Sequence, residues 1–152
     1  PGLLLSFGIA HELWSDFENP IEFVATPESY PEQPTPNFND TWSLRMGLEG
    51  HFEVASLKLT PRMGISFVPT PAPLQVGYHN YLDNDRLLIC GGVGTQVYGL
   101  EIGLAFQLQH LLQRSFSKDP ALTSSFDDYA YPGDFEHAGT LYFTTLDVSM
   151  EF

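Results

Sequence analysis

Apolar and polar residues alternate regularly at the C-terminal end of the sequence. One set comprises Tyr142, Thr144, Leu146, Val148, Met150 and Phe152. The intervening set comprises Thr145, Asp147, Ser149 and Glu151. Successive side chains of a β-strand point to opposite faces, so this period of two predicts a strand with one apolar face that closes at Phe152.

Five further segments show the same alternation. They are Leu3–Trp14, Trp42–Phe52, Ala55–Phe67, Leu87–Val97 and a segment that begins at Leu100. We therefore expect about six strands, each near the ten residues that a tilted bilayer-crossing strand requires. Pro61 has no backbone N–H to donate, so it predicts a bulge or bend within its strand.

The expected connections alternate between long and short. Long loops are expected over residues 16–40, 68–85 and 115–137, and tight turns near 53–56 and 98–99. Bacterial outer-membrane barrels have short periplasmic turns and longer extracellular loops. The pattern therefore predicts an all-β, antiparallel transmembrane β-barrel in the outer membrane of a Gram-negative cell. It places both Pro1 and Phe152 on the periplasmic side and most of the acidic charge in the extracellular loops.

Composition excludes several other classes of protein. Lys and Arg total 6 against 19 Asp and Glu, for a formal charge of -13, and so the chain lacks the clustered cations that nucleic acids require. Cys90 is the only cysteine, which excludes an intramolecular disulfide framework. No apolar run approaches the roughly 20 residues of a membrane-spanning helix. No secretory signal follows Pro1, and we expect the numbering to begin at a mature or truncated end.

The alternative fold is a soluble antiparallel sandwich or a lipocalin-like barrel, in which apolar and polar residues also alternate. Three features oppose it. The long loops lie at one end only, charged residues occur on the supposed inner face of nearly every strand, and the apolar face continues to the final residue. In a soluble barrel the apolar face points inward, whereas here it has to point outward to lipid.

No motif for catalysis or for a cofactor is present in the sequence. The five histidines are scattered without the spacing of metal ligands, and no G-x-S-x-G nucleophile elbow occurs. We therefore predict no enzymatic activity, no metal site and no cofactor.

The charged residues of the expected strands share the face opposite to the apolar one. This lumen-facing polar set comprises Glu12, Arg45, Glu49, Lys58, Arg62, Arg86, Glu101, Asp147 and Glu151. Charges of both signs on adjacent strands can pair across a lumen. Two interpretations stay open and are compatible: an ion-pair network that rigidifies a filled barrel, and a polar wall along a transport path.

Four segments of the sequence resemble the long-chain fatty acid transporter family of outer-membrane proteins, which includes the toluene and xylene channels. In order, they are LWSDF at 13–17, DTWSLRMGLE at 40–49, RMGISFVPTPAP at 62–73 and NYLDNDR at 80–86. The resemblance covers roughly residues 3–107. It implies a fourteen-stranded barrel with an N-terminal hatch in the lumen, of which residues 1–152 form the C-terminal segment without the hatch and the earlier strands.

The resemblance implies passive uptake of long-chain fatty acids or other hydrophobic compounds. Apolar ligands need concave apolar area with few polar anchors, and we expect apolar loop residues to form an outer capture surface. These residues are Phe17, Ile21, Phe23, Leu74, Val76, Tyr78 and Tyr81. The family's ligand contacts do not carry over position by position, since Gly50-His51 replaces the aromatic residue that often follows the glutamate.

The second functional hypothesis is a structural or adhesive outer-membrane barrel, with a closed lumen and acidic surface loops. In either case the expected partners are outer-membrane lipid and lipopolysaccharide. A terminal aromatic residue after alternating apolar positions also resembles the signal read by the barrel assembly machinery, which is the partner expected for the strand that ends at Phe152. Six strands cannot close a lipid-facing barrel, for which eight is the usual minimum. We therefore expect either that residues 1–152 are a fragment of a longer chain or that the chain pairs with other chains.

Overall fold

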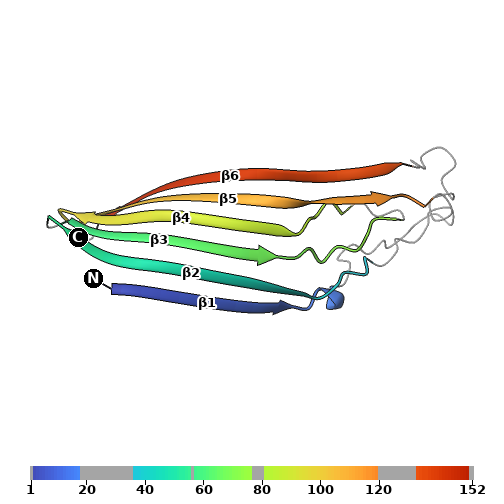
Figure 1. Cartoon of the computed structure of the whole chain (residues 1–152), viewed down its shortest axis with the longest axis horizontal. Coiled ribbons are helices and arrows are strands. Elements are labelled where there is room, and N and C mark those ends of the chain that lie inside the picture. Colours follow the sequence, from blue (N-terminus) through green and yellow to red (C-terminus); the bar gives the residue numbers. More distant parts are fainter. Residues whose placement is uncertain (1, 18–35, 56, 77–80, 120–132, 151–152) are drawn as a thin grey trace, which may run out of the picture.

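The computed structural model describes residues 2–17, 36–55, 57–76, 81–119 and 133–150. They form one six-stranded antiparallel sheet in which every strand pairs with the next along the chain (Figure 1). The strands are β1 (Gly2–Glu12), β2 (Thr41–Val54), β3 (Leu57–Val68), β4 (Arg86–Val97), β5 (Leu100–Ser117) and β6 (Asp134–Met150). The all-β class and the six meandering strands are thus confirmed, and β1 and β6 are the two edges of the described sheet.

The remaining regular element is a single turn of 3-10 helix, η1 (Trp14–Asp16). The predicted first strand therefore ends two residues early, at Glu12 rather than Trp14. The backbone N–H of Ser15 donates to Oδ1 of Asp40 at 2.8 Å, which stabilises the turn. Among the described residues, no helix is long and apolar enough to cross a membrane.

The two ends of the sheet differ in their connections (Figure 1). At the turn end, β4 and β5 are joined by Tyr98 and Gly99, both of which have positive φ. A two-residue hairpin turn that matches the twist of its strands requires this conformation at both positions. Residues 55 and 56 join β2 to β3 at the same end. The strand ends that the three longer connections join all lie at the opposite end, the loop end. The predicted alternation of long and short connections is therefore present.

The registers divide the side chains into an apolar and a polar face. The apolar face carries Leu3, Leu5, Phe7 and Ile9 of β1, Trp42, Leu44, Met46 and Leu48 of β2, Leu59, Met63, Ile65 and Phe67 of β3, Leu87, Ile89 and Val93 of β4, Ile102, Leu104, Phe106 and Leu108 of β5, and Tyr142, Leu146, Val148 and Met150 of β6. From the turn end to the level of His110, no described residue on this face is Asp, Glu, Lys or Arg.

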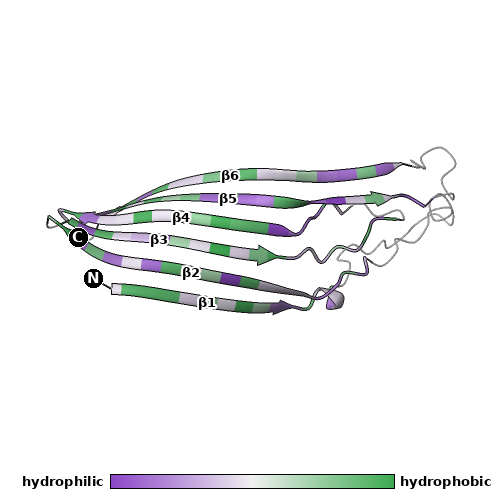
Figure 2. Ribbon diagram, in the orientation of Figure 1, coloured by the Kyte–Doolittle hydropathy of each residue, from purple (hydrophilic) through white to green (hydrophobic). Residues whose placement is uncertain are grey.

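The apolar face is bare. Among the described residues the buried apolar side chains are Pro36, Ala72 and Phe116, and none of them belongs to this face. Leu3 is 72% exposed and Leu146 is 68% exposed, although both belong to regular strands. Figure 2 shows hydrophobic residues recurring along every strand. The described residues therefore form no hydrophobic core on the apolar face of the sheet.

Two details of the strands differ from the sequence-based expectation. Strands β5 and β6 extend into the predicted 115–137 loop, because Phe116 pairs with Phe135 beyond a β-bulge between Leu111 and Arg114. The bulge expected at Pro61 is absent, since the β2–β3 and β3–β4 registers are the same on both sides of it. The pairing with β2 is merely interrupted at that level.

Candidate functional site: the loop end of the polar face

The Pro-rich segment 69–76 is held against residues 81–85 by side-chain hydrogen bonds. The backbone N–H of Thr70 donates to Oδ1 of Asp85 at 2.8 Å, and the Thr70 hydroxyl donates to Oδ2 of Asp83 at 2.7 Å. Gln75, only 2% exposed, donates to the carbonyl of Pro73 and accepts from the backbone N–H of Tyr81. The segment therefore has a defined conformation although it contains no regular structure.

Arg114 of β5 attaches this segment to the sheet. Its guanidinium donates through Nη1 to the carbonyl of Asp83 at 3.0 Å and through Nη2 to the carbonyl of Ala72 at 2.5 Å. Among the described residues, the ion pairs are those of Glu49 with Arg62 and His51 and that of Asp83 with Arg86. Within that part of the chain, Arg114 has no carboxylate at ion-pair distance, and its two hydrogen bonds are to backbone carbonyls.

Asn84 joins the same loop to the two following strands. It is 3% exposed, and its Nδ2 donates to the carbonyls of Leu112 at 2.7 Å and His137 at 3.0 Å. Since the amide nitrogen makes both of these bonds, the amide oxygen faces Nδ1 of His137 at 2.8 Å and the imidazole is the donor there. A buried side chain that satisfies three partners fixes the position of the loop over β5 and β6.

A hollow of about 660 Å³ lies between this loop and β5. It is lined by Asn39, Thr70, Ala72, Pro73, Leu74, Val76, Asp85, Leu112, Gln113 and Arg114. Half of these side chains are apolar, the only cation among them is Arg114 and the only anion is Asp85. A concave apolar site with a few polar groups is the usual form of a site for a small apolar ligand.

An aromatic cluster lies beside the loop. Phe38 is its centre, with ring centroids 5.0 Å from Tyr81, 5.6 Å from Phe17 and 6.3 Å from Trp14. Phe38 could not be predicted from the sequence, because it precedes β2 in an irregular segment where no periodicity marks it.

The capture-surface residues fall into three groups. Phe17 and Tyr81 belong to the aromatic cluster, and Leu74 and Val76 line the loop-end hollow. Ile21, Phe23 and Tyr78 lie outside the described residues. The structure thus brings Phe17 and Tyr81 together through Phe38, and Leu74 and Val76 together across the hollow.

The predicted lumen-facing residues share the polar face of the sheet. The registers place Glu12, Arg45, Glu49, Lys58, Arg62, Arg86, Glu101 and Asp147 on this face, and Glu151 lies outside the described residues. Glu49 and Arg62 are directly opposite on adjacent strands and form an ion pair of 2.6 Å. His51 lies 3.0 Å from the same carboxylate.

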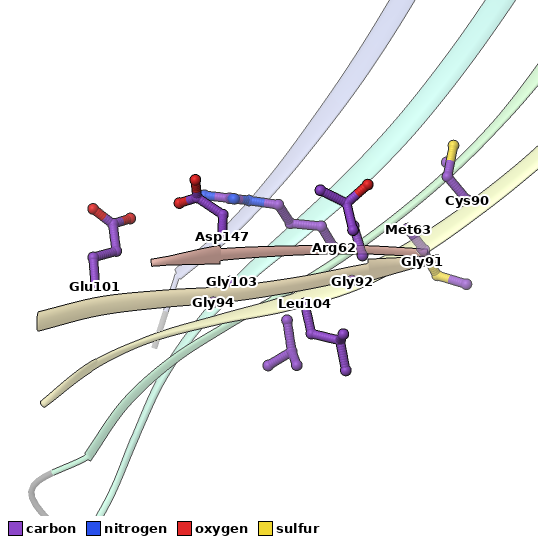
Figure 3. Close-up of a pocket in the computed structure, with 14 residues that line it drawn as sticks. Arg62, Met63, Cys90, Gly91, Gly92, Gly94, Glu101, Gly103, Leu104 and Asp147 are labelled. Atoms are coloured by element: carbon purple, nitrogen blue, oxygen red, sulfur yellow. The ribbon is translucent and has the colours of Figure 1, made fainter. Parts of the chain in front are cut away.

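A second hollow, of about 390 Å³, lies towards the turn end of the polar face. Glycines 92, 94 and 103 form its floor (Figure 3). Figure 3 shows Arg62, Glu101 and Asp147 pointing to one side of the sheet and Leu104 to the other. Glycines on adjacent strands leave room on this face that side chains would otherwise fill.

The pKa values of two groups near the loops are shifted. The hydrogen bond from the Ser15 backbone N–H, followed by one from its hydroxyl, lowers the pKa of Asp40. Burial lowers the pKa of Lys118, whose ammonium lies 5.5 Å from the centre of the Phe116 ring. In its charged form the Asp40 carboxylate therefore stabilises the contact with Ser15 of η1.

Comparisons with models of protein families, with curated proteins and with solved structures found no match for this chain.

Proposed function

We propose that this chain is a membrane-spanning part of an outer-membrane β-barrel, with its apolar face in lipid. The observation that carries the proposal is a charge-free, exposed apolar face that continues across six strands. From Leu57 to Phe67 it extends over ten residue steps, about 33 Å at roughly 3.3 Å per residue. At the usual tilt of about 40°, this gives a width of about 25 Å, which equals the apolar band of transmembrane barrels.

The boundary of the band at the loop end supports the same proposal. His11 stacks on Trp42 with ring centroids 4.2 Å apart, and Nδ1 of His110 lies 3.0 Å from the Thr140 hydroxyl. Tyr142 follows on the same face of β6. Aromatic and polar side chains at this level are typical of a membrane–water interface, where amphipathic rings are enriched.

Near the loop end the chain covers part of its polar face, whereas it leaves the apolar face bare. In β2, Ser43 on the polar face is 1% exposed, whereas its neighbours Trp42 and Leu44 on the apolar face are 54% and 42% exposed. A soluble sandwich or lipocalin-like barrel requires the reverse, because its apolar face forms the core. The coverage therefore favours lipid over water outside the sheet, with the polar face towards a lumen. Further strands then pair with the edges β1 and β6.

The proposed activity is passive uptake of long-chain fatty acids or other hydrophobic compounds. The loop-end hollow supports it, because apolar residues such as Leu74 and Val76 surround a single cation, Arg114. This arrangement fits an amphiphile whose carboxylate meets the guanidinium while its chain contacts the apolar wall. The aromatic cluster around Phe38 adds apolar surface at the same end.

A second candidate is a structural or adhesive barrel with a closed lumen. The observation that favours it is the Pro-rich loop itself, which is folded over the polar face and held there by Arg114 and Asn84. Such a barrel shows neither conductance nor saturable ligand binding, and these two measurements separate the candidates.

Oleate flux into liposomes tests the proposed function. The protein reconstituted into vesicles with an internal fatty-acid-sensitive dye should accelerate oleate entry over protein-free vesicles. Leu74→Asp should reduce the rate at low oleate at least threefold, because Leu74 lines the hollow. Leu82→Asp is the matched control, since Leu82 is an exposed loop leucine outside the hollow. Flux equal to that of protein-free vesicles rejects uptake and leaves the closed barrel.

A further inference from the structure

The polar face is divided into a charged half and an uncharged half. In the β1–β3 half, charges occur at mid-height, with Arg45 and Glu49 in β2 and Arg62 in β3, and Lys58 lies at the turn end. In the β4–β6 half, the described residues carry no charge between Arg86 and Arg114 at the loop end and Glu101 and Asp147 at the turn end. This asymmetry is not visible from the alternation of any single strand.

Exposed apolar side chains lie in the uncharged half. Leu141 is 42% exposed and Phe143 is 48% exposed, and both face the same side as Asp147, not the apolar face. Their register partners across β5 are Gln109 and Gln107. Exposed apolar side chains on a face that is polar elsewhere indicate contact with something apolar on that side.

The two hollows lie at the ends of this strip. At the loop end, Arg114 lines the first hollow and pairs in register with His137 of β6. At the turn end, Thr145, two residues beyond Phe143, lines the glycine-floored hollow. From His137 to Phe143 the strand rises about 20 Å, at roughly 3.4 Å per residue.

We propose that the uncharged half is a binding track for the hydrocarbon chain of a single-chain amphiphile whose anionic head meets Arg114. The track comprises Leu88, Gln107, Gln109, Leu111, Leu141 and Phe143. Charge complementarity selects this occupant. Arg114, whose guanidinium has no carboxylate at ion-pair distance among the described residues, lies at the loop end of the track, whereas Arg45, which also lacks one, lies in the charged half. No charge along the track has to be desolvated by a hydrocarbon chain. The inference rests on the proposed function, since it makes the track an internal continuation of the capture hollow.

Cys90 offers a reporter in the unmodified protein. It is the only cysteine, it is exposed, and it lies on the polar face opposite Gln107, which in turn pairs with Phe143. Oleate at saturating concentration should slow the reaction of Cys90 with a water-soluble maleimide at least fivefold in the reconstituted protein. This measurement requires no substitution and is therefore independent of any folding defect. An unchanged reaction rate when oleate is bound overturns the track.

Substitutions test whether oleate binds at the track. Phe143→Ser should weaken oleate binding, measured by a fluorophore on Cys90, about tenfold, which corresponds to about 1.4 kcal/mol. Leu4→Ser is the matched control, because Leu4 is an exposed apolar residue of the polar face in the charged half. The affinity of this variant for oleate should stay within twofold of that of the parent protein. Equal affinities of the Phe143→Ser variant and the parent contradict the proposal.

The flux and binding measurements distinguish failure of the proposed track from failure of the proposed uptake. If oleate flux is present but Cys90 is neither protected nor sensitive to Phe143→Ser, the track is wrong and the proposed uptake stands. If flux equals that of protein-free vesicles while oleate protects Cys90 and Phe143→Ser removes the protection, uptake is wrong and the track stands as a binding site.

Discussion

An arginine introduced at mid-height of the apolar face should prevent stable insertion into a bilayer. Leu104 lies four residues from Leu100 and six from His110 along β5, near the middle of the proposed apolar band, and it is 50% exposed. Arginine at the midplane of a transmembrane barrel is unfavourable by about 2–4 kcal/mol, against about 0–1 kcal/mol near the interface. We therefore expect Leu104→Arg to lower the insertion equilibrium roughly 30- to 700-fold.

Two further variants test whether this face is surrounded by lipid or by a protein core. Leu100→Arg changes the same face at the edge of the band and should have a small effect. Ala105→Arg changes the adjacent, exposed position on the polar face and should also have a small effect. In a soluble fold the penalty does not follow the depth of a bilayer, so equal destabilisation by Leu100→Arg and Leu104→Arg refutes the reasoning.

Urea titration of folding into lipid vesicles measures these free energies. The inserted fraction is read as the band of altered mobility in unheated gels, and the midpoints are compared at constant lipid. A larger destabilisation by Ala105→Arg than by Leu104→Arg assigns the two faces in reverse and contradicts the proposed orientation.

Three further results should follow from the loop end. Arg114→Lys should destabilise the attachment of the Pro-rich loop to the sheet by about 2 kcal/mol, because a lysine cannot make both hydrogen bonds in the same geometry. Faster proteolysis of the loop measures this destabilisation. Asn84→Ala should destabilise the same loop by about 1–3 kcal/mol by leaving buried groups unpaired, with slower proteolysis or no change as the contrary result. The folded-state pKa of Asp40 is lowered, so its contribution to stability is present above the unfolded value of about 3.9 and is lost as pH falls through the folded value. Fluorescence of Trp14 in a Trp42→Phe background should follow this loss on acidification, and Asp40→Asn should abolish the transition.

Much of the sheet could be predicted from the sequence, because the alternation in each strand depends on local residue order alone. The period of two identifies the faces, and Tyr98-Gly99 marks a tight turn. The extension of β5 and β6 could not be predicted in this way. It depends on pairing between Phe116 and Phe135, which lie outside the alternating segments.

The loop end was largely beyond sequence reasoning, because its contacts join residues far apart in the chain. Arg114 and Ala72 are 42 positions apart, and Asn84 and His137 are 53 apart. No periodicity links such pairs. Phe143 was missed for a different reason, since it follows Tyr142 directly and two consecutive aromatic residues do not show which face of β6 is apolar.

A cysteine scan of β6 tests the central claim most directly. Spin labels at positions 142 to 149, placed one at a time in a Cys90→Ser background and reconstituted in vesicles, report collisions with oxygen in lipid and with a nickel chelate in water. We expect labels at 144, 146 and 148 to collide mainly with oxygen, and labels at 145, 147 and 149 mainly with the nickel chelate. Nickel accessibility at every position, or alternation in the opposite phase, contradicts a lipid-facing apolar face.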